Sequence, residues 1–325
     1  MKKRLPKKKK KAFLPRFLVL LISSCFLLFL FWKVYGALSE SVWDGEHQLN
    51  IVFDSRPTVV ASFSPAQDKL VLLLVPDKTF VETAHGYGQY RLEAIWELGK
   101  LENRPALLAE SCQGGLGLVI DGFVGDQREN LVLPTSGEGQ EKQVQKKLLG
   151  TFFQLVKKRK ATNLTRWDLV RLFWQMGKVR FDKVSLIDLG QTSALLPTTL
   201  PDGSSGFKID QNRLDTILAR FFQDEKIITE GISLEVVNAT DHFGLAAQGA
   251  RLVANLGGRV ISLKDSQEKK SQCQIKSLKE EKDSYTLKRL AKVFGCRSET
   301  GSLGDSRAEA VLILGNNYWQ RLNEK

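Results

Sequence analysis

Five charged residues between positions 54 and 91 are of types that could carry chemistry: Asp54, Arg56, Asp77, Lys78 and Arg91. Carboxylates hold metal ions and accept protons, and arginine and lysine hold anionic groups. The same residue types also occupy ordinary polar turns at a protein surface. Residue type alone favours the turn interpretation, so these five are candidates for catalysis and no more than that.

A second candidate site lies near the C-terminus, where an expected strand leads into an expected helix. The turn between them contains Asn238, Thr240, Asp241 and, at the helix start, Gly244. Free backbone N–H groups at such a helix start favour an anion or a carbonyl-rich ligand. In the alternative interpretation, Asn238 and Thr240 cap the helix and Gly244 permits close packing. We favour the second interpretation, because no triple-glycine phosphate loop is present.

The N-terminal residues predict a basic cytoplasmic tail, residues 1–12, followed by a transmembrane anchor, residues 13–36. Residues 17–32 carry no charge, and Arg16 and Lys33 can reach the lipid headgroups from the two ends. Because the lysine-rich tail should stay in the cytoplasm, we expect the C-terminal region outside the cell membrane. A cleaved signal peptide is the alternative, but no small-residue cleavage site follows the apolar run.

The net charge of +12 arises largely from this tail. Ten of the 48 basic residues stand at or before Lys33 and the first acidic residue is Glu40, so the remaining chain has 38 basic and 36 acidic residues. We therefore expect no nucleic-acid partner, since anionic lipid accounts for the basic tail. No CxxC motif occurs and the histidines are scattered, so no metal site is expected. Cys273 and Cys296 belong to the exported region, but their spacing does not decide whether they pair.

Hydrophobic patterns predict two α/β regions beyond the anchor. The first region, residues 46–200, begins with short apolar strands and continues with amphipathic helices. Its expected strands are 50–53, 59–63, 70–75 and 116–124, and its expected helices are 92–99, 107–112, 148–160 and 169–177. Residues 201–227 are expected to be a linker and a short helix, because 197–206 are rich in Pro, Gly and Ser. Residues 228–320 alternate strands with helices, which predicts a small α/β sandwich.

The C-terminal segments SLEVVNATDHFGLAAQGARLVANLGGRVISL, TLKRLAKVFGC and AEAVLILGNNY resemble the LytR C-terminal domain over residues 231–318. In that family a strand ends in an N-G-T-like turn, a G-L-A helix follows, and a V-x-L-G-x-D-Y segment closes the domain. Residues 238–240 match the turn and residues 244–246 match the helix start, whereas Asn317 stands where aspartate is common. The resemblance implies a bacterial envelope protein and leaves the ligand of this domain undefined.

The segment VVASFSPAQDKLVLLLVPDKTFVETAHGYGQYRLEAIWELGK resembles the catalytic core of the LytR–CpsA–Psr family, and the resemblance extends over residues 46–200. Gly86, Tyr87 and Gly88 match the G-Y-G loop of the family, and Leu92 and Trp96 match the helix after it. Members of that family transfer a phosphorylated glycopolymer from a polyprenyl-pyrophosphate lipid to peptidoglycan, usually with magnesium. The resemblance implies that arginines would hold the pyrophosphate and carboxylates the metal.

The departures from this family pattern argue against catalysis. Where the family has I-P-R-D-T, this chain has Val75-Pro76-Asp77-Lys78-Thr79, so an acid replaces the arginine. The arginine-rich helix of the family is replaced by a run with Lys142, Lys146 and Lys147. Lysine meets a phosphate as a point charge and cannot form the two-pronged contact of arginine.

Aromatic residues at helical spacing leave two further interpretations open. They could line an apolar tunnel for a polyprenyl chain, or they could belong to the core, which is the commoner role. The residues concerned are Trp96, Phe152, Phe153, Trp167, Phe173 and Trp174.

The sequence thus predicts a membrane-anchored α/β protein with a degenerate LytR–CpsA–Psr-like α/β domain followed by a small α/β sandwich, the LytR C-terminal domain. We expect a binding or scaffolding role at the cell wall, with peptidoglycan or a wall glycopolymer as partner and no cofactor. The alternative is an active phosphotransferase that attaches lipid-linked glycopolymer to peptidoglycan and needs Mg²⁺. A transcriptional attenuator fits less well, because only residues 1–12 would remain in the cytoplasm. The oligomeric state is not defined by the sequence.

Overall fold

The computed structural model describes residues 41–128, 131, 140–157, 161–200, 203–279 and 281–324, with isolated positions before residue 41. Residues 13–36, where the anchor is predicted, lie outside these described residues apart from single positions. Of the helices that the structure describes, none is long and apolar enough to cross a membrane. The residues from Val42 onward form one compact unit, distinct from those before it.

The first sheet has the strand order β6-β1-β2-β3-β7. Its strands are β1 (Leu49–Phe53), β2 (Thr58–Ser64), β3 (Lys69–Val75), β6 (Gly122–Val124) and β7 (Val184–Asp188). Strand β2 is antiparallel to both β1 and β3, while β6 runs parallel to β1 and β7 parallel to β3. The central strands are nearly continuous apolar runs, because helices cover both faces of the sheet.

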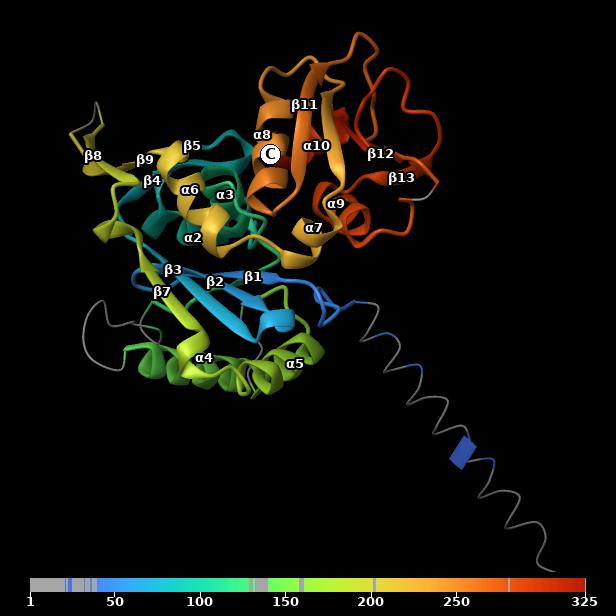
Figure 1. The fold of residues 1–325 in the computed structure, drawn as a ribbon. Coiled ribbons are helices and arrows are strands. Elements are labelled where there is room, and N and C mark those ends of the chain that lie inside the picture. The colour runs from blue at the N-terminus through green and yellow to red at the C-terminus, as the bar shows by residue number, and fades with distance from the viewer. Residues whose placement is uncertain are drawn as a thin grey trace, which may run out of the picture. The chain divides into compact units, whose positions relative to one another are not determined.

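Two pairs of helices cover the two faces of this sheet, as Figure 1 shows. These helices are α2 (Leu92–Leu101), α3 (Leu107–Leu116), α4 (Gln140–Lys157) and α5 (Arg166–Met176). Helices α4 and α5 pack against one face through side chains such as Leu148 and Leu169. Helices α2 and α3 pack against the other face through Ile95, Trp96 and Leu108. Helix α5 begins with a capping box between Thr165 and Asp168.

The stretch predicted as a linker belongs to a second sheet, with the order β5-β4-β9-β8. Its elements and the helices after it are β4 (Thr79–Thr83), β5 (Gly88–Arg91), β8 (Leu195–Thr199), β9 (Ser205–Ile209), α6 (Gln211–Phe221) and α7 (Glu225–Glu230). Leu214, Leu218 and Phe222 join the core beneath α2 and α3. The short helix predicted within 201–227 is present as α6, whereas the linker prediction is wrong at β9, which pairs with β4 and β8.

The C-terminal region forms a third sheet with the order β11-β10-β14-β12-β13. Its elements are β10 (Ser233–Asn238), α8 (Leu245–Asn255), β11 (Arg259–Asp265), β12 (Gln274–Ser277), α9 (Tyr285–Phe294), β13 (Arg297–Thr300), β14 (Ala310–Leu314) and α10 (Asn316–Asn323). Strand β10 is central and parallel to β11 and β14, so its Leu234 and Val236 are fully buried. This is an α/β arrangement, as predicted.

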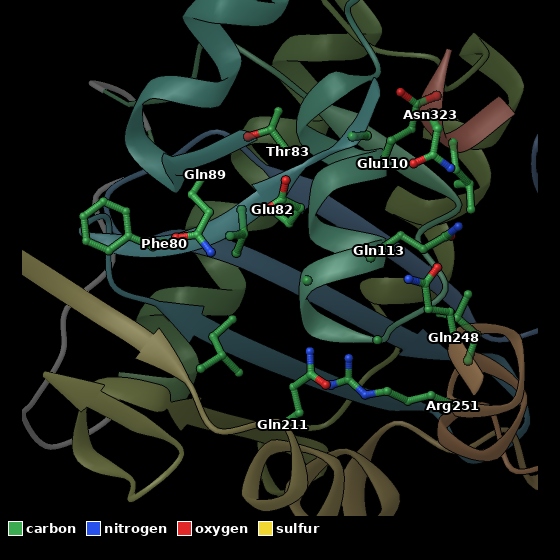
Figure 2. Close-up of a pocket in the computed structure, with 18 of the residues that line it drawn as sticks. Phe80, Glu82, Thr83, Gln89, Glu110, Gln113, Gln211, Gln248, Arg251 and Asn323 are labelled. Atoms are coloured by element: carbon green, nitrogen blue, oxygen red, sulfur yellow. The ribbon is translucent and has the colours of Figure 1, made fainter. Parts of the chain in front are cut away.

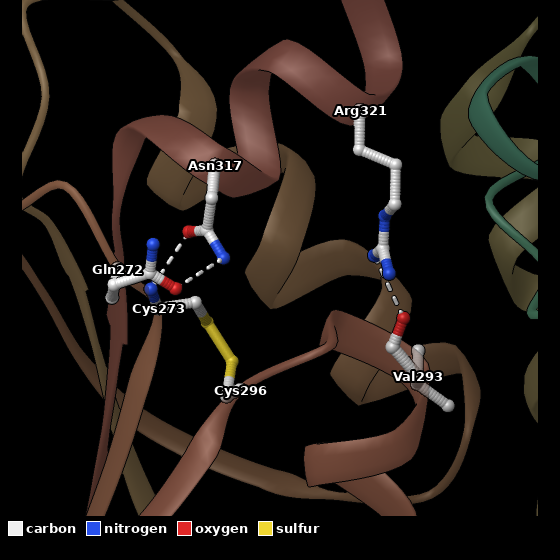
Figure 3. The surroundings of a disulfide bond; sticks show 6 residues. All are labelled: Gln272, Cys273, Val293, Cys296, Asn317 and Arg321. Carbon is white, nitrogen blue, oxygen red and sulfur yellow. Dashed lines mark hydrogen bonds between the residues drawn. A yellow bond between two sulfur atoms is a disulfide. The ribbon is translucent and has the colours of Figure 1, made fainter.

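A disulfide joins Cys273, just before β12, to Cys296, just before β13 (Figure 3). It closes a loop with a sequence separation of 23, which in the chain-entropy view contributes about 3 kcal/mol. The Oδ1 atom of Asn317 accepts a hydrogen bond from the Cys273 N–H at 2.7 Å. The bridge resolves the pairing that spacing left open, and it suits an oxidising compartment.

Buried ion pairs join the C-terminal region to the rest of the compact unit. Arg289 on α9 contacts Asp121, just before β6, at 2.8 and 2.9 Å, and the two side chains are only 2% and 6% exposed. Burial acts to raise the pKa of Asp121, but the Arg289 guanidinium outweighs it and holds that pKa below its usual range. Arg251 on α8 makes a second two-pronged contact, with Asp215 on α6. Such contacts fix the orientation as well as the distance of the two groups.

Candidate functional site

Charged residues from three strands meet at one edge of the first sheet. Strands β1, β3 and β6 point the same way, so the residues that follow them lie at the same edge. Asp54 follows β1, Asp77 lies two residues after β3, and Arg128 lies four residues after β6. We call Asp54, Asp77 and Arg128, together with Thr58 at the start of β2, the sheet-edge cluster.

The strongest contact in the cluster is a buried ion pair. Arg128 Nε donates to Asp54 Oδ1 at 2.7 Å, and the side chains are 15% and 1% exposed. Desolvation is the largest influence on Asp54 and raises its pKa, although Arg128 acts in the opposite direction. The pair therefore holds a carboxylate in a site where ionisation is costly.

Asp77 is the less completely paired carboxylate. Burial raises its pKa more than the charge of Arg128 and a hydrogen bond from the Thr58 backbone N–H lower it. Asp77 Oδ1, Arg128 Nη2 and Thr58 Oγ1 are buried and make no hydrogen bond to the described residues. Buried polar atoms are nearly always paired, so this edge retains unused capacity to bind.

The remaining three candidates from the sequence do not join the cluster through any contact among the described residues. Arg56 is exposed, and its charge acts only weakly on Asp77. Lys78 is exposed as well. Arg91 points elsewhere, because it donates to the Ser205 carbonyl at 2.9 Å and lies 3.6 Å from Glu93. The structure thus brings Asp54 and Asp77 together and leaves Lys78 and Arg91 apart.

Arg128 was not predicted from the sequence. A signal was available, since Arg128 closely follows the apolar segment that ends in β6. Asp54 N–H donates to the Val124 carbonyl, and Gln127 N–H donates to the Asp54 carbonyl. The pairing of β1 with β6 therefore sets Arg128 beside Asp54, but nothing local to residue 128 predicts that pairing.

The polar turn after β10 satisfies its hydrogen bonds internally. Asn238 Oδ1 accepts from the N–H and the hydroxyl of Thr240, and its Nδ2 donates to the His242 carbonyl and to Asp265. Lys269 donates to the Thr240 carbonyl and pairs with Asp241 at 3.2 Å. These contacts account for the turn without a ligand.

Two details of the capping interpretation differ from the expectation. No side chain caps α8, whose N-cap residue is Gly244, so Asn238 and Thr240 stabilise the turn itself. Gly244 has φ of 81°, and an added Cβ would meet nothing within 4 Å. Glycine is therefore favoured there by its left-handed backbone and not by close packing.

The aromatic residues separate into two groups. Trp96 and Phe152 are buried, which confirms the core interpretation for them. Phe153, Trp167, Phe173 and Trp174 are 46%, 44%, 41% and 68% exposed. They line neither a core nor an enclosed tunnel, and both predictions are wrong for them.

A cavity of about 510 Å³ lies between the second sheet, α3, α8 and α10 (Figure 2). Its lining is rich in side-chain amides, contributed by Gln89, Gln113, Gln211, Gln248 and Asn323. The lining has no net charge, because it contains two acidic residues, Glu82 and Glu110, and two basic residues, Lys208 and Arg251. Arg251 is already bound to Asp215, and Glu110 to His85 at 2.8 Å. We call this the amide-lined cavity, and none of the nine residues predicted as site candidates lines it.

The comparisons with known proteins find a likeness of fold over about half of the chain. No family model and no curated protein matches the sequence. The LytR-CPS2A-psr family protein YwtF (TagT) with bound octaprenyl pyrophosphate lipid matches with 16% identity and a TM-score of 0.36, over 53% of this chain and 88% of that one. TagV from B. subtilis matches with 14% identity and a TM-score of 0.39, over 54% and 95%. A protein from Listeria innocua matches with 12% identity and a TM-score of 0.38, over 53% and 95%.

Among the described residues, no group of three or more His, Cys, Asp or Glu side chains is arranged to hold a metal ion. Asp77 Oδ1 is a buried carboxylate oxygen that makes no hydrogen bond to the described residues, so it is the cluster atom best suited to contact a cation.

Proposed function

We propose that this chain is a single-pass, LytR–CpsA–Psr-like protein of the bacterial cell envelope that binds a wall polymer without making or breaking bonds. The motif resemblances over residues 46–200 and 231–318 support the family and the compartment. The predicted anchor supports attachment to the cell membrane with the C-terminal region outside, and the Cys273–Cys296 disulfide supports an exported location.

The observation that carries the binding role is the chemistry of the amide-lined cavity. Each amide side chain both donates and accepts hydrogen bonds, as do the hydroxyl and acetamido groups of a glycan and the peptide bonds of a stem peptide. The side chains of Gln89, Gln211 and Gln248 make no hydrogen bond within the described residues and are exposed to an incoming ligand. A volume of about 510 Å³ is typical of small-ligand sites, which fits one or two units of a polymer.

The state of the arginines supports binding over catalysis. Stabilising a pyrophosphate needs guanidinium groups aimed at it. Arg128 is committed to Asp54, Arg91 to Ser205 and Glu93, and Arg251 to Asp215. Arg91 and Arg251 would have to leave these partners before they could hold a phosphate, and Arg128 could offer only the nitrogen that does not bond Asp54.

A blocked cavity tests the proposal. Gly114 lines the cavity on α3, and a Cβ there meets nothing within 4 Å. Gly114→Leu should fill the cavity and reduce co-sedimentation of residues 42–325 with purified cell wall at least tenfold. Gly150→Leu is the matched control, because Gly150 is also helical with open space at its Cβ but lies on α4, outside the cavity.

The hydroxyl, acetamido and peptide groups proposed to contact the cavity are neutral, so moderate salt should leave wall association unchanged. If Gly114→Leu folds and still sediments with the wall as the unaltered protein does, the cavity is not the binding site.

A second function, the glycopolymer phosphotransferase, is favoured by one observation. Asp77 Oδ1 and Arg128 Nη2 at the sheet-edge cluster are buried and make no hydrogen bond to any residue that the structure describes, and a metal-bound phosphate would supply a partner to both. In that case Asp77 would hold Mg²⁺ and Arg128 would contact the pyrophosphate with the nitrogen that Asp54 leaves unused.

A further inference from the structure

Helices α4 and α5 carry exposed aromatic and apolar side chains on the face turned away from the first sheet. The residues on these helices are Phe153, Trp167, Val170, Phe173 and Trp174, Phe181 of the short 3₁₀ helix after α5 adjoins them, and each is between 41% and 68% exposed. We call them the α4–α5 aromatic face. Trp167, Val170 and Trp174 share one side of α5, because three and seven residues separate them along the helix. Phe153 of α4 contacts Phe173 of α5, with ring centroids 5.9 Å apart, so the face is continuous across the two helices.

Basic side chains surround this face. Lys142 lies over the ring of Phe181, Arg171 over Trp167 and Lys178 over Trp174, each 5.4 or 5.5 Å from the ring centroid. Among the side chains of this segment that the structure describes, Lys146, Lys147, Arg166, Arg180 and Lys183 are also basic. The described acidic side chains there do little to offset them, since Asp168 is fully buried and Asp182 pairs with Arg180. The face therefore combines apolar rings with a surplus of positive charge.

The first residues of the compact unit, Val42 and Trp43, are bound to α5 near its start. The backbone N–H groups of Val42 and Trp43 donate to the carboxylate of Asp168, each at 3.2 Å. Arg171 donates to the Trp43 carbonyl at 2.7 Å, and the Trp43 ring is fully buried. An anchor that ends at Gly36 leaves five residues before Val42, and such a segment spans at most about 20 Å. The predicted anchor would thus hold α5 close to the membrane.

We propose that the α4–α5 aromatic face binds the outer surface of the cell membrane, with its tryptophan and phenylalanine rings at the headgroup level and its lysines and arginines on anionic headgroups. Aromatic rings and basic side chains on one helical face are the pattern of interfacial membrane binding. The five residues between the predicted anchor and Val42 would keep the α4–α5 aromatic face near the lipid surface, so the effective concentration of lipid at this face would be high. The proposal rests on the predicted anchor and does not need the proposed wall binding.

This orientation has a consequence for the rest of the molecule. Helices α4 and α5 cover one face of the first sheet, and α2 and α3 cover the other (Figure 1). The amide-lined cavity includes α3, so it lies on the side of the sheet away from α4 and α5. In a protein bound to the membrane through α4 and α5, that cavity would lie on the side of the sheet away from the membrane.

Vesicle binding of the anchorless region tests the proposal. Residues 42–325 contain every described core residue, and a cooperative thermal transition would verify the fold of each variant. The region should co-sediment with phosphatidylglycerol vesicles and only weakly with phosphatidylcholine vesicles, and added salt should weaken the binding. Trp167→Ala with Trp174→Ala should reduce the affinity on the order of tenfold.

The matched control removes exposed apolar side chains elsewhere. Phe243 and Leu263 in the C-terminal region are 100% and 51% exposed, and Phe243→Ala with Leu263→Ala should leave vesicle binding unchanged. Equal binding by the Trp167 and Trp174 variant, or no preference for anionic vesicles, would overturn the proposal. The proposal would also be overturned if the protein were a dimer and Trp167→Ala with Trp174→Ala converted it to a monomer without changing vesicle binding.

The full chain provides a second measurement that does not depend on the isolated region. Reconstituted in phosphatidylglycerol vesicles with lipids brominated near the headgroup, it should lose tryptophan fluorescence by contact quenching. Trp174→Phe should remove a quenched component, whereas replacement of the stacked Trp319 in the C-terminal region should remove an unquenched one. Equal quenching of both would contradict the proposed orientation.

Discussion

The sheet-edge cluster and the turn after β10 are both polar groups at the ends of strands, yet they differ in how their polar atoms are paired. In the turn, Asn238 and Thr240 form a closed set of hydrogen bonds with their neighbours. At the sheet edge, Asp77 Oδ1 and Arg128 Nη2 are buried and have no hydrogen-bond partner in the part of the chain that the structure describes. A closed set stabilises its own loop, whereas unpaired buried groups carry an energetic cost that a ligand could relieve.

Whether polar atoms bond to one another therefore distinguishes polar groups that stabilise the fold from polar groups that bind a ligand better than residue type does. Both sites contain a carboxylate near a cation, and both follow buried strands. At the sheet edge, burial is the largest influence on the pKa values of Asp54 and Asp77 and raises both. Perturbed carboxylates cluster at working sites and at remnants of them.

The largest expected effect concerns polymer transfer. The family pattern places an arginine where this chain has Asp77, and each missing two-pronged contact with the pyrophosphate would slow the reaction by ~10²-fold. We therefore expect no turnover of a polyprenyl-pyrophosphate glycan by the purified chain with Mg²⁺. Magnesium-dependent turnover that Asp77→Asn abolishes would assign catalysis to the cluster and reverse our proposed function.

Removal of Arg128 should cause the largest loss of stability. Arg128→Met leaves Asp54 charged and buried without its partner, which typically lowers the free energy of unfolding by ~3–5 kcal/mol. Chemical denaturation at neutral pH measures it. Asp54→Asn combined with Arg128→Met should recover much of the loss, because no unpaired charge remains. Arg180→Met is the control, since Arg180 is 80% exposed and its removal should change little. A loss equal to that of the control would mean that Asp54 is not charged in the folded protein.

The parts of this fold that were predictable from the sequence are those with a strong local pattern. Helix α9 and strand β14 lie in the region where alternating strands and helices were predicted, and each is followed directly by a glycine, Gly295 and Gly315. The strand predicted over 116–124 is wrong over most of its length, because α3 continues to Leu116 and ends at Gly117 with φ of 69°. Strand β13 was missed because its residues are all exposed, so only pairing with β12 makes it a strand.

The candidate sites also were predictable only where the sequence has a local pattern. Asp54 and Asp77 could be named because they follow recognisable strands. Arg128 and the amide-lined cavity could not, because they are created by contacts between residues far apart in the chain, such as α3 with α8 and α10. The exposure of Trp167 and Trp174 was hidden as well, since an apolar stripe on a helix normally faces a core.

Lowering the pH should relieve the destabilising effect of the buried Asp77 carboxylate in the sheet-edge cluster. Burial raises the folded-state pKa of Asp77 above its usual value of 3.8, so ionised Asp77 destabilises the fold at neutral pH and this penalty disappears as the pH falls below that value. Asp77→Asn should therefore be more stable than the unaltered chain at neutral pH, by less than the change caused by Arg128→Met. The gain should shrink toward zero as the pH falls toward 3.8.

Asp121 should show the opposite pH dependence of stability, because Arg289 lowers its folded-state pKa. Its stabilising effect is present at neutral pH and is lost as the pH falls through that lowered pKa, so Asp121→Asn should destabilise at neutral pH. Denaturation series from neutral to acid pH measure both. A neutral-pH loss of stability in Asp77→Asn would mean that its carboxylate has a partner in the folded protein.

The smallest expected effect lies in the turn after β10. Thr240→Ala with Asp241→Ala removes the hydroxyl that bonds Asn238 and the carboxylate that pairs with Lys269, at a cost of ~1 kcal/mol in the free energy of unfolding. Because the polar atoms of the turn already bond to one another, we expect this folded variant to co-sediment with cell wall as well as the unaltered protein does. The Gly114→Leu variant serves as the reference for lost association with an intact turn. If the double variant keeps its cooperative melting transition and loses wall association, then the turn binds the polymer despite its closed hydrogen bonds, and internal pairing is not a reliable sign of a purely structural role.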